Sequence, residues 1–105
     1  HNCHYCIPAH TGIAHMMKVD DDIIEALRNS TTLPTEKLQA LHTTTLALVR
    51  NRGQLSQDET SAFFTAGYEQ RNLLEIVLGI SQKVMSNYVN HLAETPVDDA
   101  FKKFE

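Results

Sequence analysis

Two cysteines and one histidine near the beginning of the chain are the residues best suited to chemistry. Cys3 and Cys6 are separated by two residues, and His10 follows four residues after Cys6. In a helix with about 100° per residue, the three side chains fall within an arc of about 60°. Two thiols at this spacing can form a disulfide and release it again, and an imidazole can accept the thiol proton. The spacing therefore predicts thiol redox chemistry.

The same segment permits two other interpretations. It is dense in nitrogen and sulfur ligands of the kind that zinc prefers, namely His1, Cys3, His4, Cys6, His10 and His15. A single helix cannot point four of these side chains at one tetrahedral centre, so we expect no metal ion and no cofactor. The two thiols could also be small buried side chains beside an incidental histidine. A purely structural disulfide between Cys3 and Cys6 is not favoured, because the loop that it would close is too short to restrict the unfolded chain much.

Composition limits the size of the protein and the kinds of partner. The chain has 105 residues, 42% of them apolar, which suits one domain with one core over residues 1–105. Its net charge is −4 and it has no basic run, so we expect no nucleic-acid partner. The longest apolar run has four residues, so we expect no membrane span. No signal peptide opens the sequence, and we expect a cytoplasmic protein.

Helical periodicity runs through nearly the whole sequence and predicts an all-α fold, a bundle of about five to six helices. Start and stop signals such as Pro8, the capping box Ser56-Gln57-Asp58-Glu59 and Pro96 divide it. The expected helices cover residues 3–17, 20–28, 34–53, 56–66 and 69–95, with a polar break at residues 29–32 and a last turn after residue 98. No stretch has the alternation of a strand or a hairpin signal.

The long helix expected after residue 69 is apolar around most of its circumference over residues 73–80. A helix of this kind is buried on nearly all sides. Four short helices cannot cover residues 73–78, so we expect a homo-oligomer with this helix buried or at an interface. We expect Met16, Met17 and Met85 to fill the core rather than to bind a metal.

Several motifs together resemble a known family. They are Cys3-His4-Tyr5-Cys6-Ile7-Pro8-Ala9-His10-Thr11, Asp21-Asp22-Ile23-Ile24-Glu25-Ala26-Leu27, Gly67-Tyr68-Glu69-Gln70, Leu74-Glu75-Ile76-Val77-Leu78, Asn87-Tyr88-Val89-Asn90-His91 and Thr95-Pro96-Val97-Asp98. This pattern resembles the alkylhydroperoxidase D-like (AhpD-like) branch of the carboxymuconolactone decarboxylase family. The resemblance covers nearly the whole chain, and its most specific part is the Cys-x-x-Cys-x-x-x-His segment.

The resemblance implies an all-α fold, a homo-oligomer that is a trimer or hexamer, and reduction of peroxide through two cysteines. It implies a dithiol protein or a lipoyl group as the electron donor. Cys3 and Cys6 match the redox pair, His10 matches the motif histidine, and Tyr5 matches the position between the cysteines. The family's proton-relay glutamate lies on a preceding helix, so we expect residues 1–105 to lack one or more N-terminal helices. The decarboxylase branch generally lacks the cysteine pair, which argues against lactone decarboxylation.

The expected mechanism is a peroxidase cycle of two thiols. Cys6 lies one helical turn from His10, so we assign the attack on peroxide to Cys6 and formation of the disulfide to Cys3. The opposite order stays open, because Cys3 should lie nearer the helix start and be more accessible to solvent. Two other functions stay open as well. One is a disulfide reductase or isomerase, and the other is a non-catalytic helical module that senses oxidation or binds a metal.

Overall fold

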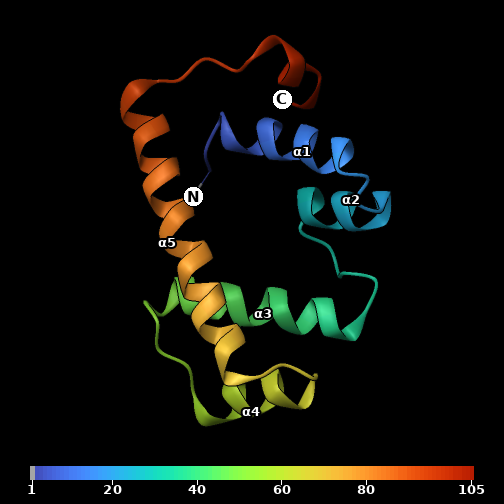
Figure 1. The fold of residues 1–105 in the computed structure, drawn as a ribbon, viewed down its shortest axis with the longest axis vertical. Coiled ribbons are helices and arrows are strands. Elements are labelled where there is room, and N and C mark those ends of the chain that lie inside the picture. Colours follow the sequence, from blue (N-terminus) through green and yellow to red (C-terminus); the bar gives the residue numbers. More distant parts are fainter. Residues whose placement is uncertain (1) are drawn as a thin grey trace. The chain divides into compact units, whose positions relative to one another are not determined.

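The structure is a computed structural model that describes residues 2–105, and within that range all of its regular secondary structure is helical (Figure 1). The elements in chain order are α1 (Cys6–Met16), α2 (Asp21–Asn29), α3 (Glu36–Arg50), α4 (Gln57–Thr65), α5 (Gln70–Ala93) and the 3₁₀ helix η1 (Asp99–Phe104). The predicted all-α fold is confirmed for this part of the chain. None of the helices described there has the length and apolar character needed to cross a membrane.

Internal contacts divide the chain into two compact units. The first unit contains residues 2–32 and Lys83–Glu105, and the second contains Leu33–Gln82. Helix α5 contributes its residues 70–82 to the second unit and its residues 83–93 to the first. The two cysteines and His10 belong to the first unit. The prediction of a single domain over residues 1–105 stays a prediction.

Helix α1 begins at Cys6, three residues later than the start predicted from the sequence. Pro8 lies in the first turn of α1. Backbone N–H groups in a first turn make no hydrogen bond within the helix, so a proline costs no helical hydrogen bond there. Helix α2 has the expected acidic first turn after Asp20, and it ends where Ser30 adopts a left-handed backbone with a φ of 56°.

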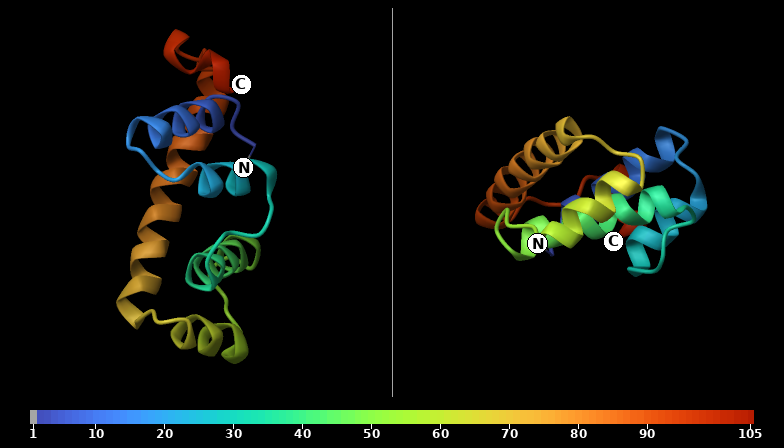
Figure 2. Two further views of the ribbon diagram at one scale, coloured as in Figure 1. Left: turned by 90° about the vertical axis from the view of Figure 1, so that its right-hand side faces the viewer. Right: turned by 90° about the horizontal axis from the view of Figure 1, so that it is seen from below.

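Helix η1 packs along α1 in the first unit, as Figures 1 and 2 show. The approach is close at Gly12, which is buried in the middle of α1. A Cβ atom at this position would lie 2.5 Å from Cδ1 of Phe101 and 3.3 Å from Cδ2 of Phe104. A glycine is therefore needed at position 12 for the two rings to cover α1. Helix α2 packs against α1 as well.

The second unit contains a core formed by Leu48, Phe63 and Ile76, which come from α3, α4 and α5. Phe63 is fully buried, and the ring of Tyr68 stacks on it with 4.6 Å between centroids. The predicted capping box at the start of α4 is confirmed. Ser56 Oγ accepts a hydrogen bond from the Glu59 backbone N–H, and the Ser56 backbone N–H donates to the Glu59 carboxylate.

The three methionines are not core residues, and that prediction is wrong. Met16, Met17 and Met85 are 73%, 74% and 65% exposed. The first two lie at the C-terminal end of α1, and Met85 is about 200° around α5 from the buried Asn87. Much of the apolar stretch at residues 73–80 is also exposed. Ile76 is buried, whereas Leu74 and Leu78 are 68% and 71% exposed.

Candidate functional site

Cys3 and Cys6 form a disulfide at the start of α1. Their Cα atoms are 5.2 Å apart, with Cys3 in the turn before the helix and Cys6 its first residue. Both residues are buried, Cys3 at 3% and Cys6 at 7% exposure. The expectation that Cys3 is the more accessible of the two is wrong, since Cys3 lies before the helix, in the turn, and is the less exposed residue.

The sulfur of Cys3 lies at the N-terminus of α1. The backbone N–H of Cys6 donates a hydrogen bond to Cys3 Sγ, with 3.2 Å between nitrogen and sulfur. The first amides of a helix have no partner inside the helix and carry the positive end of its dipole. A Cys3 thiolate formed on reduction would therefore gain one charge-assisted hydrogen bond from the backbone.

The sulfur of Cys6 is contacted by two asparagines from the last part of α5. Asn87 Nδ2 lies 2.9 Å from Cys6 Sγ, and Asn90 Nδ2 lies 3.4 Å from it. Asn87 is itself buried, at 6% exposure, so its amide has no bulk water to replace this contact. A disulfide sulfur is only a weak acceptor, whereas a thiolate is a strong one. The two amides are thus placed to stabilise a charge on Cys6.

The two asparagines were not predicted as site residues. In the sequence they belong to the segment Asn87-Tyr88-Val89-Asn90-His91, one part of the family resemblance. A signal was available, because Asn87 and Asn90 are spaced i, i+3 on a largely apolar helix and must lie on one face. What no local pattern could supply was their pairing with a cysteine more than 80 positions earlier.

His10 lies one turn after Cys6 as predicted, but it contacts the Cys6 backbone and not the sulfur. His10 Nδ1 is 3.0 Å from the Cys6 carbonyl oxygen, and His10 Nε2 is 2.9 Å from Lys83 Nζ. A carbonyl can only accept, so Nδ1 donates and carries the ring proton. The Nε2 lone pair then faces Lys83, whose pKa is lowered by burial. The histidine is held in one tautomer with its basic nitrogen beside a second titratable group.

The residues between the cysteines are tied to the segment that follows α5. The Tyr5 hydroxyl donates a hydrogen bond to Asp98 at 2.8 Å, and His4 Nε2 donates to the Thr95 carbonyl at 2.7 Å. The hydrogen bond to the Asp98 carboxylate raises the pKa of Tyr5. The His4 ring also stacks with His91, with 6.4 Å between centroids. These contacts fix the turn that carries the disulfide.

The histidines of this segment do not gather around one point. Within residues 2–105, no three histidine, cysteine, aspartate or glutamate side chains are arranged to hold a metal ion. His15 instead stacks on Phe104 and lies 3.7 Å from the carboxylate of Asp21. His1, which belonged to the predicted set of possible ligands, lies outside the described residues. Nothing in the described part of the chain therefore favours the metal-binding interpretation.

Comparison with known proteins adds no further assignment. The sequence matches no model of a protein family, and no curated protein matches it significantly. The geometry around Cys3 and Cys6 is therefore the basis for any function proposed for the chain.

Proposed function

We propose that the chain is a thiol-dependent peroxidase of the AhpD-like type, in which Cys3 and Cys6 cycle between dithiol and disulfide. The observation that carries the proposal is the Cys3–Cys6 disulfide with three N–H donors on its sulfurs. Hydrogen bonds of this kind stabilise a thiolate far more than a disulfide, so they are expected where a thiol must ionise to react.

The proposed reaction has three steps. The Cys6 thiolate attacks one peroxide oxygen and breaks the O–O bond, giving a Cys6 sulfenic acid and an alkoxide that takes up a proton to become an alcohol. The Cys3 thiol then attacks the Cys6 sulfur, which forms the disulfide and releases water. A donor dithiol reduces this disulfide by two thiol exchanges and leaves as a disulfide itself. Each cycle reduces one peroxide and oxidises one donor dithiol.

Cys6 is the proposed attacking residue on two grounds. It lies one turn from His10, and its sulfur has two amide donors where Cys3 has one backbone donor. Two charge-assisted hydrogen bonds favour the thiolate at Cys6 over that at Cys3. His10 is proposed to act on Cys6 indirectly, by holding the Cys6 carbonyl through Nδ1 and Lys83 through Nε2, because a ring with both nitrogens bonded has no lone pair left to take the thiol proton.

The burial of both sulfurs favours a small oxidant. A peroxide can reach the sulfur of a residue that is 3% to 7% exposed with a modest opening, whereas a folded protein disulfide needs a sulfur at the surface. This observation favours a peroxidase over a disulfide reductase or isomerase. The donor must reach the same sulfurs, so of the two donors that the resemblance implies, a dithiol protein or a lipoyl group, we propose the slender lipoyl group.

A homo-oligomer, a trimer or hexamer, is part of the same proposal. Helix α5 leaves large apolar side chains exposed along its length, among them Leu74, Leu78 and Leu92 at 68%, 71% and 87% exposure. One face of α5 carries Leu74, Leu78, Met85 and Leu92, which are separated by four, seven and seven residues as in a helix-packing seam. A second copy of the chain would remove this apolar surface from water.

The test is to trap the sulfenic acid in single cysteine variants. Reduced Cys3→Ser and Cys6→Ser proteins are treated with a small alkyl hydroperoxide in the presence of a carbon nucleophile that is specific for sulfenic acids. The proposal expects rapid trapping on Cys6 in Cys3→Ser and slow trapping on Cys3 in Cys6→Ser. Equal slow trapping in both variants, at the rate of a free cysteine, would contradict peroxidase function.

A further inference from the structure

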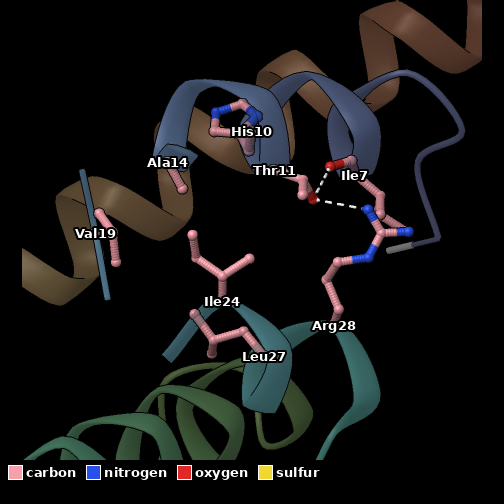
Figure 3. A pocket seen from close by; sticks show the side chains of 8 residues that line it. All are labelled: Ile7, His10, Thr11, Ala14, Val19, Ile24, Leu27 and Arg28. Atoms are coloured by element: carbon pink, nitrogen blue, oxygen red, sulfur yellow. Dashed lines mark hydrogen bonds between the residues drawn. The ribbon is translucent and has the colours of Figure 1, made fainter. Parts of the chain in front are cut away.

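The first unit contains an apolar cavity between α1 and α2 (Figure 3). Its volume is about 330 Å³, near the lower end of the range of about 300–1,000 Å³ for small-molecule sites. Ile7 and Ala14 line it from α1, and Ile24 and Leu27 line it from α2. Figure 3 shows these side chains with Val19 at one end of the row and Arg28 at the other. The cavity is thus an apolar slot with one charged end.

Arg28 brings the charge, and its contacts hold it at the cavity. One guanidinium nitrogen, Nη1, donates to Thr11 Oγ1 at 3.2 Å and to the Phe104 carbonyl at 2.7 Å. The ion pairs formed among residues 2–105 do not include Arg28. A guanidinium has five N–H donors in a planar fork that matches a carboxylate. The remaining donors of Arg28 therefore suit an acid that the described part of the chain does not provide.

We propose that this cavity binds an aliphatic carboxylate of medium chain length, with the chain between α1 and α2 and the carboxylate on Arg28. Apolar walls favour an alkyl chain, with each buried methylene strengthening binding about fourfold. One cation at one end favours a ligand with a single acidic group at its terminus. The small volume favours a short to medium chain over a long fatty acid.

The cavity shares His10 with the redox site. The His10 side chain lines the cavity, and its Nδ1 holds the Cys6 carbonyl. A carboxylate ligand of this kind would be the organic part of the peroxide. Its hydroperoxide group would have to lie near the carboxylate end, because Ile7, in the first turn of α1, lies at the Arg28 end of the cavity. This assignment as substrate depends on the proposed peroxidase function, whereas the binding of the carboxylate does not.

The experiment is calorimetric titration of the oxidised protein, which cannot turn over. Octanoate is the ligand probe, hexanoate is the shorter acid, and octylamine replaces the acid by a cation. The proposal expects hexanoate to bind about 16-fold more weakly than octanoate, from two methylenes at about fourfold each, and octylamine not to bind. Binding of octylamine as tight as that of octanoate would overturn the proposal.

Two pairs of variants locate the site. Arg28→Met should weaken octanoate binding about tenfold. This is the low end of the range for a charge-assisted hydrogen bond, because Arg28 is exposed to solvent. Arg50→Met removes an equal charge from the end of α3 and should leave binding unchanged. Ala14→Leu fills the cavity and should abolish binding, while Ala47→Leu, at an equally half-buried alanine of α3, should not. Unchanged binding in both Arg28→Met and Ala14→Leu would refute the site.

Far-UV circular dichroism of each variant separates lost binding from lost folding. This matters for Arg28→Met, because that change also removes the bond to the Phe104 carbonyl. Ala14→Leu leaves this bond intact and so gives an independent result. Octanoate binding without peroxidase activity would leave the site standing and refute the proposed function. Peroxidase activity without octanoate binding would refute the carboxylate site and leave the proposed function standing.

Discussion

The contact between Asn87 and Cys6 gives the sharpest quantitative prediction. Asn87→Leu keeps the size of the side chain and removes the donor that lies 2.9 Å from Cys6 Sγ. A hydrogen bond to a charged group contributes about 1.5–3 kcal/mol, so its loss should lower the thiolate population of reduced Cys6 about 10- to 100-fold at neutral pH. A thiolate without this bond is more nucleophilic, and on a logarithmic scale this offsets nearly half of the effect that the smaller thiolate population has on the reaction rate. The expected net decrease in reaction rate is about 3- to 10-fold.

The assay is alkylation by iodoacetamide, followed by mass spectrometry, in a Cys3→Ser background where Cys6 is the remaining thiol. Asn90→Leu is the matched comparison, because its amide is farther from the same sulfur at 3.4 Å. We expect the rate at neutral pH to fall in the order parent, Asn90→Leu, Asn87→Leu. At a pH where the thiol is fully ionised, the Asn87→Leu protein should react at least as fast as the parent.

The alkylation rate of Asn87→Leu should be below that of the parent at neutral pH and at least equal to it at high pH. This change of order with pH distinguishes stabilisation of the thiolate from a change in access to the sulfur. If Asn87→Leu merely opened or closed the buried site, the rate would change by the same factor at every pH. A uniform factor, or no change at neutral pH, would refute the argument that the asparagines stabilise a Cys6 thiolate.

Three further predictions concern stability and assembly. In chemical unfolding, Gly12→Ala should destabilise the protein by about 1–3 kcal/mol, because the added Cβ would overlap an aromatic ring of η1. Gly79→Ala should instead stabilise α5 by about 0.5–1 kcal/mol, because no atom lies within 4 Å of its added Cβ. The reverse order of stabilities would contradict the packing of η1 on α1. Ser56→Ala should cost about 1 kcal/mol. The hydrogen bond from the Ser56 backbone N–H lowers the pKa of the Glu59 carboxyl, so its contribution is present above the ordinary value of 4.5 and is lost as the pH falls below it. Glu59→Gln should accordingly lower the melting temperature at neutral pH but not in strong acid, and an equal decrease at both would argue against this linkage. Leu78→Lys should convert the proposed oligomer to a monomer in sedimentation analysis, and an unchanged mass would exclude this face of α5 from the interface.

Local signals were sufficient to predict helices in both units. The capping box at Ser56 and Glu59 fixed the start of α4, because both of its hydrogen bonds join residues three positions apart. The acidic turn before α2 and the apolar periodicity of α5 are local in the same sense. Each of these elements was predicted to within a few residues.

The surroundings of the disulfide could not be predicted in the same way. The spacing of Cys3 and Cys6 indicated that the two sulfurs could pair, but the contacts made by Cys6 and His10 come from residues distant in sequence. Contacts from Asn87 and Lys83 reach the first turns of α1 across more than 70 positions. Helical periodicity predicts which face of a helix a residue lies on, but it does not predict which other segment packs against that face. The role predicted for His10 changed for this reason, since Lys83 takes the nitrogen that was expected to face a thiol.

The most direct test of the account is a single-turnover titration of the fully reduced protein with one equivalent of an alkyl hydroperoxide. The account predicts that both thiols disappear together, much faster than free cysteine reacts. The product should be the intramolecular Cys3–Cys6 disulfide, lighter by two hydrogen atoms, with one equivalent of alcohol released. Thiols that persist on this timescale, or a stable sulfinic acid without a disulfide, would contradict the central claim that Cys3 and Cys6 form one redox centre for peroxide.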